Sequence, residues 1–210
     1  MYELSDSQFI DKQFNIDEDN NITHRQILDR IEEAIKSKEL SQDKSLELCK
    51  KVKLQYAVQE TLKCLICAAD ENLGNTSLII KQGENGEIED INISPAYDLD
   101  FSFNIGEEML NGIPQKMITY RTTEDGKIDL QSIIDEFKDI EGYKEAMQEI
   151  QDKFSGSYIN EIFDIAYQET KLDIFNEKEF RDRFSGFIMR RVATFKEALK
   201  ETVDKDKLKN

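Results

Sequence analysis

The stretch "AADENLGNTSLII", Ala68 to Ile80, decides the fold, because an apolar helix ends there in a run of acidic and amide residues. The segment "LKCLICAA" at 62–69 is apolar on nearly every side, which is typical of a fully buried helix. The segment "TSLIIKQ" at 76–82 is rich in β-branched residues and predicts a strand. We therefore expect a buried helix to end at Asp70 and to lead into a strand.

A second strand should pair with the first to form a β-hairpin. The sequence "GENGE" at 83–87 holds two Gly and an Asn, which are turn residues, and "IEDINIS" at 88–94 alternates apolar and polar side chains. Pro95 should end this strand because proline lacks the N–H donor that a ladder hydrogen bond needs. We expect the hairpin to pack at the C-terminal end of the buried helix.

Helical periodicity covers most of the remaining chain. Thr23 and Gln26 form a capping-box pattern before an apolar face of Ile27, Ile31, Ala34 and Ile35. After a break at 37–42, the buried helix should run from about Asp43 to Ala69. Further helices are expected at roughly 128–138, 143–153, 156–170 and 176–202. In the last one we expect Asn176 as the N-cap and a buried stripe of Phe180, Phe184, Phe187, Ile188, Val192, Phe195 and Leu199.

The composition restricts the partners and the cellular location that we expect for this protein. A chain of 210 residues with 39% hydrophobic and 34% charged residues can bury a core of its own. The net charge of -16 argues against nucleic acids and anionic membranes as partners, because phosphate contacts need clustered Lys and Arg. No apolar run approaches the length of a membrane span, and the start "MYELSDSQF" does not show the basic start and apolar core that are typical of a signal peptide. We expect a cytoplasmic location.

Three polar residues in these segments match the needs of phosphoryl transfer from ATP. Such a reaction uses one Asp that orients the attacking hydroxyl, and an Asn and a second Asp that hold Mg²⁺ on the phosphates. Asp70 and Asn75 share the loop after the buried helix, and Asp98 in "ISPAYDLD" follows the hairpin. The five-residue step from Asp70 to Asn75 equals the step between the Asp and the Asn of a kinase catalytic loop.

The segment "DENLGNTSLII…INISPAYDLD" resembles the C-terminal lobe of the HipA-like serine/threonine kinases, best between Leu62 and Asp100. The resemblance implies a mainly α fold with a small β-hairpin, a protein-kinase-like (HipA-like) C-lobe. It implies Asp70 as the catalytic Asp, and Asn75 and Asp98 as the residues that bind Mg²⁺ and, through it, ATP. It also implies a Ser- or Thr-containing protein substrate, and a bacterial toxin–antitoxin or regulatory kinase.

The chain departs from the family pattern in two ways. Asn72 stands where the family has His, and Glu71 stands where it has Arg, which adds a negative charge beside the loop. Residues 1–69 contain no Gly and no Gly-rich phosphate loop followed by a strand Lys. We therefore expect an excised C-lobe, half of a split kinase that needs an N-lobe or antitoxin protein as partner, or an inactive relative. Mg²⁺ and ATP should not bind tightly to this chain alone.

These expectations divide the chain into an irregular segment at 1–22, a helical C-lobe at 23–203 with the catalytic loop and hairpin at 70–98, and a frayed tail at 204–210. The alternative function is a non-catalytic interaction or regulatory module that keeps the C-lobe fold. The simplest alternative for residues 70–75 is a helix-to-strand turn with no catalytic or metal-binding role, because Asp, Asn and Gly are good turn formers.

The other residues that could take part in catalysis or metal binding are expected to have structural roles. Cys64 and Cys67 form C-x-x-C inside a helix and, like Cys49, are interpreted as buried small apolar residues in a reducing compartment. His24, the only His, is expected on the surface. "NIDEDNNITHRQ" at 15–26 resembles a calcium loop but has Asn20 and Gln26 where Gly and Glu are required. Four arginines of the last helix are expected to form structural ion pairs, with binding of a phosphorylated partner as the alternative: Arg181, Arg183, Arg190 and Arg191.

Overall fold

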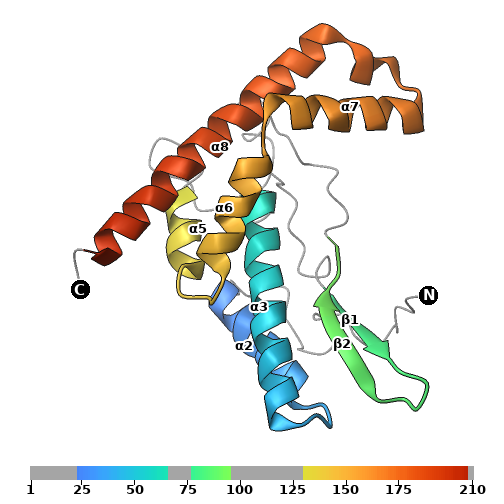
Figure 1. The fold of residues 1–210 in the computed structure, drawn as a ribbon, viewed down its shortest axis with the longest axis vertical. Helices are drawn as coiled ribbons and strands as arrows, with labels where there is room; N and C mark the ends of the chain where they lie inside the picture. Colours follow the sequence, from blue (N-terminus) through green and yellow to red (C-terminus); the bar gives the residue numbers. More distant parts are fainter. Residues whose placement is uncertain (1–22, 66–76, 96–129, 208–210) are drawn as a thin grey trace.

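The computed structural model describes residues 23–65, 77–95 and 130–207, with side chains described up to Lys200. Figure 1 shows a mainly helical arrangement with one two-stranded antiparallel hairpin, which confirms the coarse fold class expected from the sequence. The elements are α2 (His24–Lys36), α3 (Gln42–Leu65), β1 (Leu78–Gln82), β2 (Ile88–Ile93), α5 (Leu130–Phe137), α6 (Tyr143–Lys153), α7 (Gly156–Thr170), the 3₁₀ helix η3 (Asp173–Asn176) and α8 (Lys178–Lys207).

Helix α2 begins with the capping box that the sequence predicted. The backbone N–H of Gln26 donates to Oγ1 of Thr23 at 3.3 Å, and the backbone N–H of Thr23 donates to Oε1 of Gln26 at 2.8 Å. Two otherwise unpaired N–H groups of the first turn are satisfied in this way. The four predicted apolar residues of α2 are all buried.

Helix α3 lies at the centre of the described structure. It contacts α2, α5, α6 and α8 as well as β2, and in Figure 1 the hairpin and the pair α5–α6 lie on opposite sides of it. Its buried residues span the whole length of the helix: Leu48, Cys49, Val52, Tyr56, Ala57, Glu60, Thr61, Lys63, Cys64 and Leu65. The predicted central helix is thus confirmed as far as Leu65, beyond which residues 66–76 lie outside the described part.

The hairpin lies along the middle of α3, so its predicted position at the C-terminal end of this helix is wrong. Lys51 Nζ lies 2.7 Å from both carboxylate oxygens of Asp90, and Gln55 Nε2 donates to Oδ1 of Asn92 at 3.0 Å. The backbone N–H of Ile93 donates to Oε1 of Gln55 at 2.9 Å. Polar side chains in the middle of α3 therefore hold β2 alongside the helix, a pairing that strand patterns alone cannot reveal.

A left-handed glycine separates α5 from α6. Gly142 has φ +81°, and a Cβ added at this position would lie 3.3 Å from Cδ2 of Leu54 on α3. A residue with a side chain would be strained in this backbone conformation. The turn that starts α6 at Tyr143 therefore depends on glycine.

Helix α8 begins two residues later than expected. Asn176, the predicted N-cap, is the last residue of η3, and α8 starts at Lys178. The extra turn places Phe175 of η3 against Phe180, with ring centroids 6.2 Å apart. The predicted stripe of α8 is buried at Ile188, Val192, Phe195 and Leu199, whereas its three phenylalanines are only partly buried. The helix continues to Lys207, past the start of the predicted tail.

Glu32 on α2 accepts hydrogen bonds from Lys36 and, across to α3, from Lys53. The hydrogen bond from Lys36, followed by that from Lys53, lowers the pKa of Glu32 to about 2. A depressed carboxyl pKa stabilises the fold above the unfolded pKa near 4.5, and this stability is lost as the pH falls through the folded pKa.

We expect Glu32→Gln to lower the free energy of unfolding at neutral pH by about 1 kcal/mol, because the pair is partly exposed and solvent screens it. The difference from the wild type should vanish as the pH falls from about 4.5 to about 2. Urea unfolding followed by far-UV circular dichroism over this range tests the prediction. Glu33→Gln, an exposed change in the same helix, is the matched control, and a Glu32→Gln deficit that stayed constant with pH would contradict the prediction.

Candidate functional site

The three predicted site residues, Asp70, Asn75 and Asp98, lie outside the described residues. Their neighbours Glu71 and Asn72 lie outside them too. The structure describes instead the elements to which these segments are joined. Those elements are the C-terminal end of α3 and the open end of the hairpin.

An arginine of α8 binds the end of α3. Arg191 Nε donates to the carbonyl oxygen of Leu65 at 2.6 Å, and its Nη2 donates to that of Cys64 at 2.5 Å. The guanidinium also lies over the ring of Phe187, 5.5 Å from the centroid. Carbonyl groups in the last turn of a helix lack helical partners and carry partial negative charge, so a cation is favoured there. Arg191, expected in an ion pair, instead anchors the point from which the Asp70 segment leaves.

The open end of the hairpin is closed by a pair of buried serines. The backbone N–H of Ser94 donates to the carbonyl oxygen of Ser77 at 2.8 Å, and the N–H of Ser77 donates to Oγ of Ser94 at 3.3 Å. Both residues are less than 5% exposed. The two chain segments that run to Asn75 and to Asp98 therefore start side by side.

A buried ion pair lies near the end of α3, in a stretch that the sequence analysis treated as apolar. Lys63 Nζ lies 2.9 Å from Oε1 of Glu60, and the two side chains are only 5% and 3% exposed. The i, i+3 spacing allows the contact, but nothing in the sequence indicates that both charges are withdrawn from water. Desolvated charges of this kind are stable only as a pair.

His24 is half-buried in an aromatic cluster, so the solvated surface position predicted for it is wrong. Its Nδ1 lies 2.8 Å from Oη of Tyr56, and its ring lies edge-on to Phe137 at 5.2 Å. Phe137 also contacts Tyr143, whose hydroxyl lies 2.8 Å from Oγ1 of Thr61. Burial raises the pKa of Tyr143 well above its usual range. The polarity of His at the start of a helix concealed this packing role.

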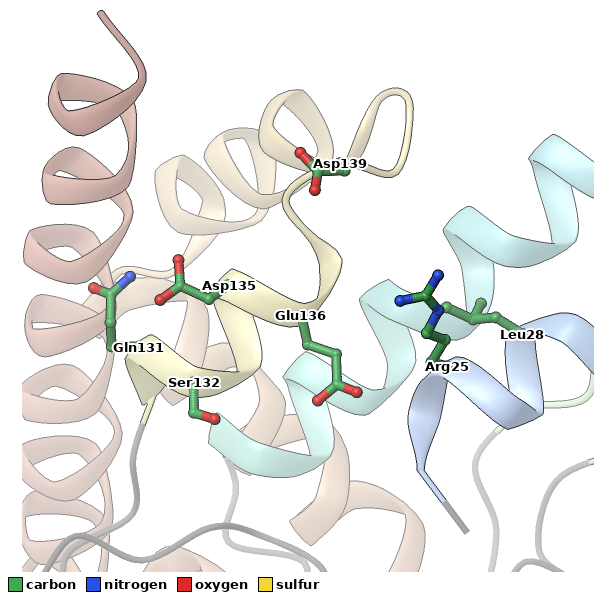
Figure 2. A pocket seen from close by; sticks show the side chains of 7 residues that line it. All are labelled: Arg25, Leu28, Gln131, Ser132, Asp135, Glu136 and Asp139. Carbon is green, nitrogen blue, oxygen red and sulfur yellow. The ribbon is translucent and has the colours of Figure 1, made fainter. Parts of the chain in front are cut away.

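A groove of about 740 Å³ lies between α2 and α5, and Figure 2 shows the seven side chains that line it. Arg25 of α2 and Glu136 of α5 lie on opposite sides of it. The lining is Arg25, Leu28, Gln131, Ser132, Asp135, Glu136 and Asp139. None of these residues is buried, and Asp135 is held by Lys138 at 3.1 Å. The groove is therefore a shallow depression of the surface with charges of both signs, and it is not a preorganised binding site.

The remaining candidates have structural roles where they are described. Cys49 and Cys64 are buried, as expected, and Cys67 lies outside the described residues. Gln26, the closing position of the calcium-like segment, has its side chain in the capping box of α2. Within the described ranges no three His, Cys, Asp or Glu side chains cluster as metal ligands. No helix in these ranges has the length and apolar content required to cross a bilayer.

Comparison with known proteins does not assign the chain to a family. No protein-family model matches the chain, and neither a curated protein nor a solved structure is significantly similar to it.

Proposed function

We propose that this chain is the C-terminal lobe of a HipA-like serine/threonine protein kinase. Asp70 would orient a Ser or Thr hydroxyl of a protein substrate, and Asn75 and Asp98 would hold Mg²⁺ on the ATP phosphates. The observation that carries the proposal is the sequence pair "DENLGN" and "SPAYD", with kinase spacing and with a hairpin between them.

The described frame is compatible with this role. Phosphoryl transfer depends on positioning, so its acidic and amide groups need rigid attachment points. The segment that contains Asp70 and Asn75 connects the end of α3, held by Arg191, to β1. The segment that leads to Asp98 begins at Ser94, which is paired with Ser77. Both segments thus join elements that are anchored in the core.

A second protein, which supplies the N-lobe, would neutralise the negative charge of the ATP phosphates. ATP brings negative charge to a chain of net charge -16, and Glu71 adds to it next to Asp70. A kinase N-lobe supplies a Lys and a Gly-rich backbone that offset such repulsion. The partner is therefore an N-lobe protein with a Gly-rich loop and a strand Lys.

The test begins with calorimetric titration of Mg·ATP into the full chain, for which we expect weak or no binding. We then expect radiolabelled phosphate transfer to Ser or Thr when the chain is mixed with the product of a neighbouring reading frame that encodes such an N-lobe. Asp70→Ala should reduce the transfer rate by roughly 10²–10⁴-fold, the usual contribution of a positioned acid–base group. The circular dichroism spectrum should not change.

Two results would overturn the assignment. Transfer that survives Asp70→Ala would remove the catalytic role from this residue, and tight Mg·ATP binding by the chain alone would place a nucleotide site elsewhere in it. Asp100, two residues after Asp98 in the same segment, is the fallback Mg²⁺ ligand, and Asp100→Asn compared with Asp98→Asn shows which of the two acids serves. Absence of transfer in every mixture would favour the alternative, a non-catalytic interaction module.

A further inference from the structure

Helix α7, η3 and the first half of α8, residues 156–192, form a projection that we call the arm. Figure 1 shows α7 and η3 extending away from the bundle around α3. The arm has its own small core, separate from the main one, in which only Ile159, Phe163, Ile188 and Val192 are fully buried among the described residues. A helical pair with so few buried side chains gains stability when further helices pack against it.

The exposed apolar side chains of the described structure concentrate on this arm. Tyr158, Ile162 and Ile165 follow one another at helical spacing on α7 and are 43%, 46% and 54% exposed. Leu172 and Ile174, which follow the end of α7 in the chain, are 55% and 46% exposed. Five of the seven large apolar residues exposed in the described ranges therefore fall within 17 consecutive positions. A concentration of this kind marks a docking surface rather than scattered exposure.

The arm carries charges of both signs, separated between its two helices. Helix α7 holds Glu161, Asp164 and Glu169 and no basic residue. The first half of α8, residues 178–191, holds five basic and two acidic residues. The separation makes the arm complementary to a second copy of itself, although the chain as a whole is strongly acidic.

Some of these charges are already used within the chain. Arg181 Nη1 lies 2.7 Å from Oδ1 of Asp164, Lys178 pairs with Asp182, and Arg191 binds the carbonyl groups of α3. The charges without an ion-pair partner among the described residues include Glu161 and Glu169 on α7, and Arg183 and Arg190 on α8.

We propose that the arm is a homodimer interface. The α7 stripe of Tyr158, Ile162 and Ile165 packs against the arm of a second copy, and the two unpaired acids of α7 meet the two unpaired arginines of the other copy's α8. A two-fold axis repeats each contact, so each of these four charges meets one of the opposite sign in the other copy. An unrelated partner would need to match both signs and the apolar stripe together, which a second copy does by symmetry. This inference does not depend on the proposed kinase function.

The experiment is sedimentation velocity on the full chain, with circular dichroism as the fold control. We expect a monomer–dimer equilibrium that weakens in high salt, because part of the attraction is electrostatic. Ile162→Asp should raise the dimer Kd by roughly tenfold or more, as expected for a central apolar contact. Leu46→Asp is the matched control, because Leu46 is the most exposed large apolar residue of the described ranges and lies on α3, outside the arm.

Exchanging the charges of α7 and α8 separates an effect on dimer formation from an effect on the stability of the fold. The double variant Glu161→Lys/Glu169→Lys and the double variant Arg183→Glu/Arg190→Glu should each weaken the dimer, since they place like charges together. A chain carrying all four changes should recover it, because the pairs are restored with opposite polarity. A monomeric wild type would overturn the proposal and indicate that another segment or another protein covers the stripe. A dimer that tolerates Ile162→Asp, or a fourfold variant that does not recover, would overturn it as well.

Discussion

Lys63→Met is expected to lower the free energy of unfolding by about 3–5 kcal/mol, because it removes a cation in direct contact with the buried carboxylate of Glu60. The two charged groups lie 2.9 Å apart and are almost fully withdrawn from water. Methionine keeps most of the volume of the lysine stem, so the loss reports the removal of the lysine charge rather than a cavity.

Two further variants separate the effect of the lost charge from the effect of changed packing. Lys50→Met removes an exposed lysine on the same helix, whose partner Glu141 is also exposed, and should change stability by less than about 1 kcal/mol. The double variant Glu60→Leu/Lys63→Met should recover most of the loss, since an apolar pair of similar size needs no compensation. Urea unfolding followed by far-UV circular dichroism is the measurement, because the chain contains no Trp. If Lys63→Met behaved like Lys50→Met, the pair would be hydrated and the prediction wrong.

Phe137→Ala is expected to destabilise the fold by about 3–5 kcal/mol through the cavity that it leaves. The ring is fully buried at the end of α5 and contacts His24, Tyr56 and Tyr143 at centroid distances of 5.2, 6.1 and 5.9 Å. It thereby joins α2, α3, α5 and α6, whose other contacts cannot close around an empty site.

Phe137→Leu should lose less than Phe137→Ala, because it retains most of the buried apolar volume. Leu46→Ala is the control for losing an exposed apolar side chain, since Leu46 is 57% exposed and is not in the main core. The measurement is again urea unfolding, with the slope against urea compared among variants. A Phe137→Ala loss no larger than that of Leu46→Ala would show that the site collapses or that the ring is not central.

The positions of the helices could be predicted because their signals are local. The apolar face of α2 and the stripe of α8 follow the helical period, and Thr23 with Gln26 satisfies the first turn within four residues. The N-cap of α8 was misplaced because Phe175 gains contacts with Phe163 and Phe180 only when the chain makes a 3₁₀ turn first. Side-chain contacts across helices outweighed the local preference of Asn176 for a cap.

The candidate site rests on a different kind of information. Asp70, Asn75 and Asp98 were selected by residue type and spacing, which indicate a chemistry but not a geometry. The structure adds the attachment of their segments at Leu65, held by Arg191, and at Ser94. The distance along the chain between Leu65 and Arg191 explains why no sequence pattern predicted this contact.

The sequence by itself determined the helix and strand segments, the β-hairpin, the apolar faces and the acidic character, because each depends on neighbouring residues and composition. Only the tertiary structure decided that the hairpin lies along the middle of α3, that His24 packs against Phe137, and that Glu60 and Lys63 form a buried pair. It also decided which charges of α7 and α8 are already paired. These features depend on contacts between elements far apart in the chain, where burial and pairing are set by the neighbours that folding brings together.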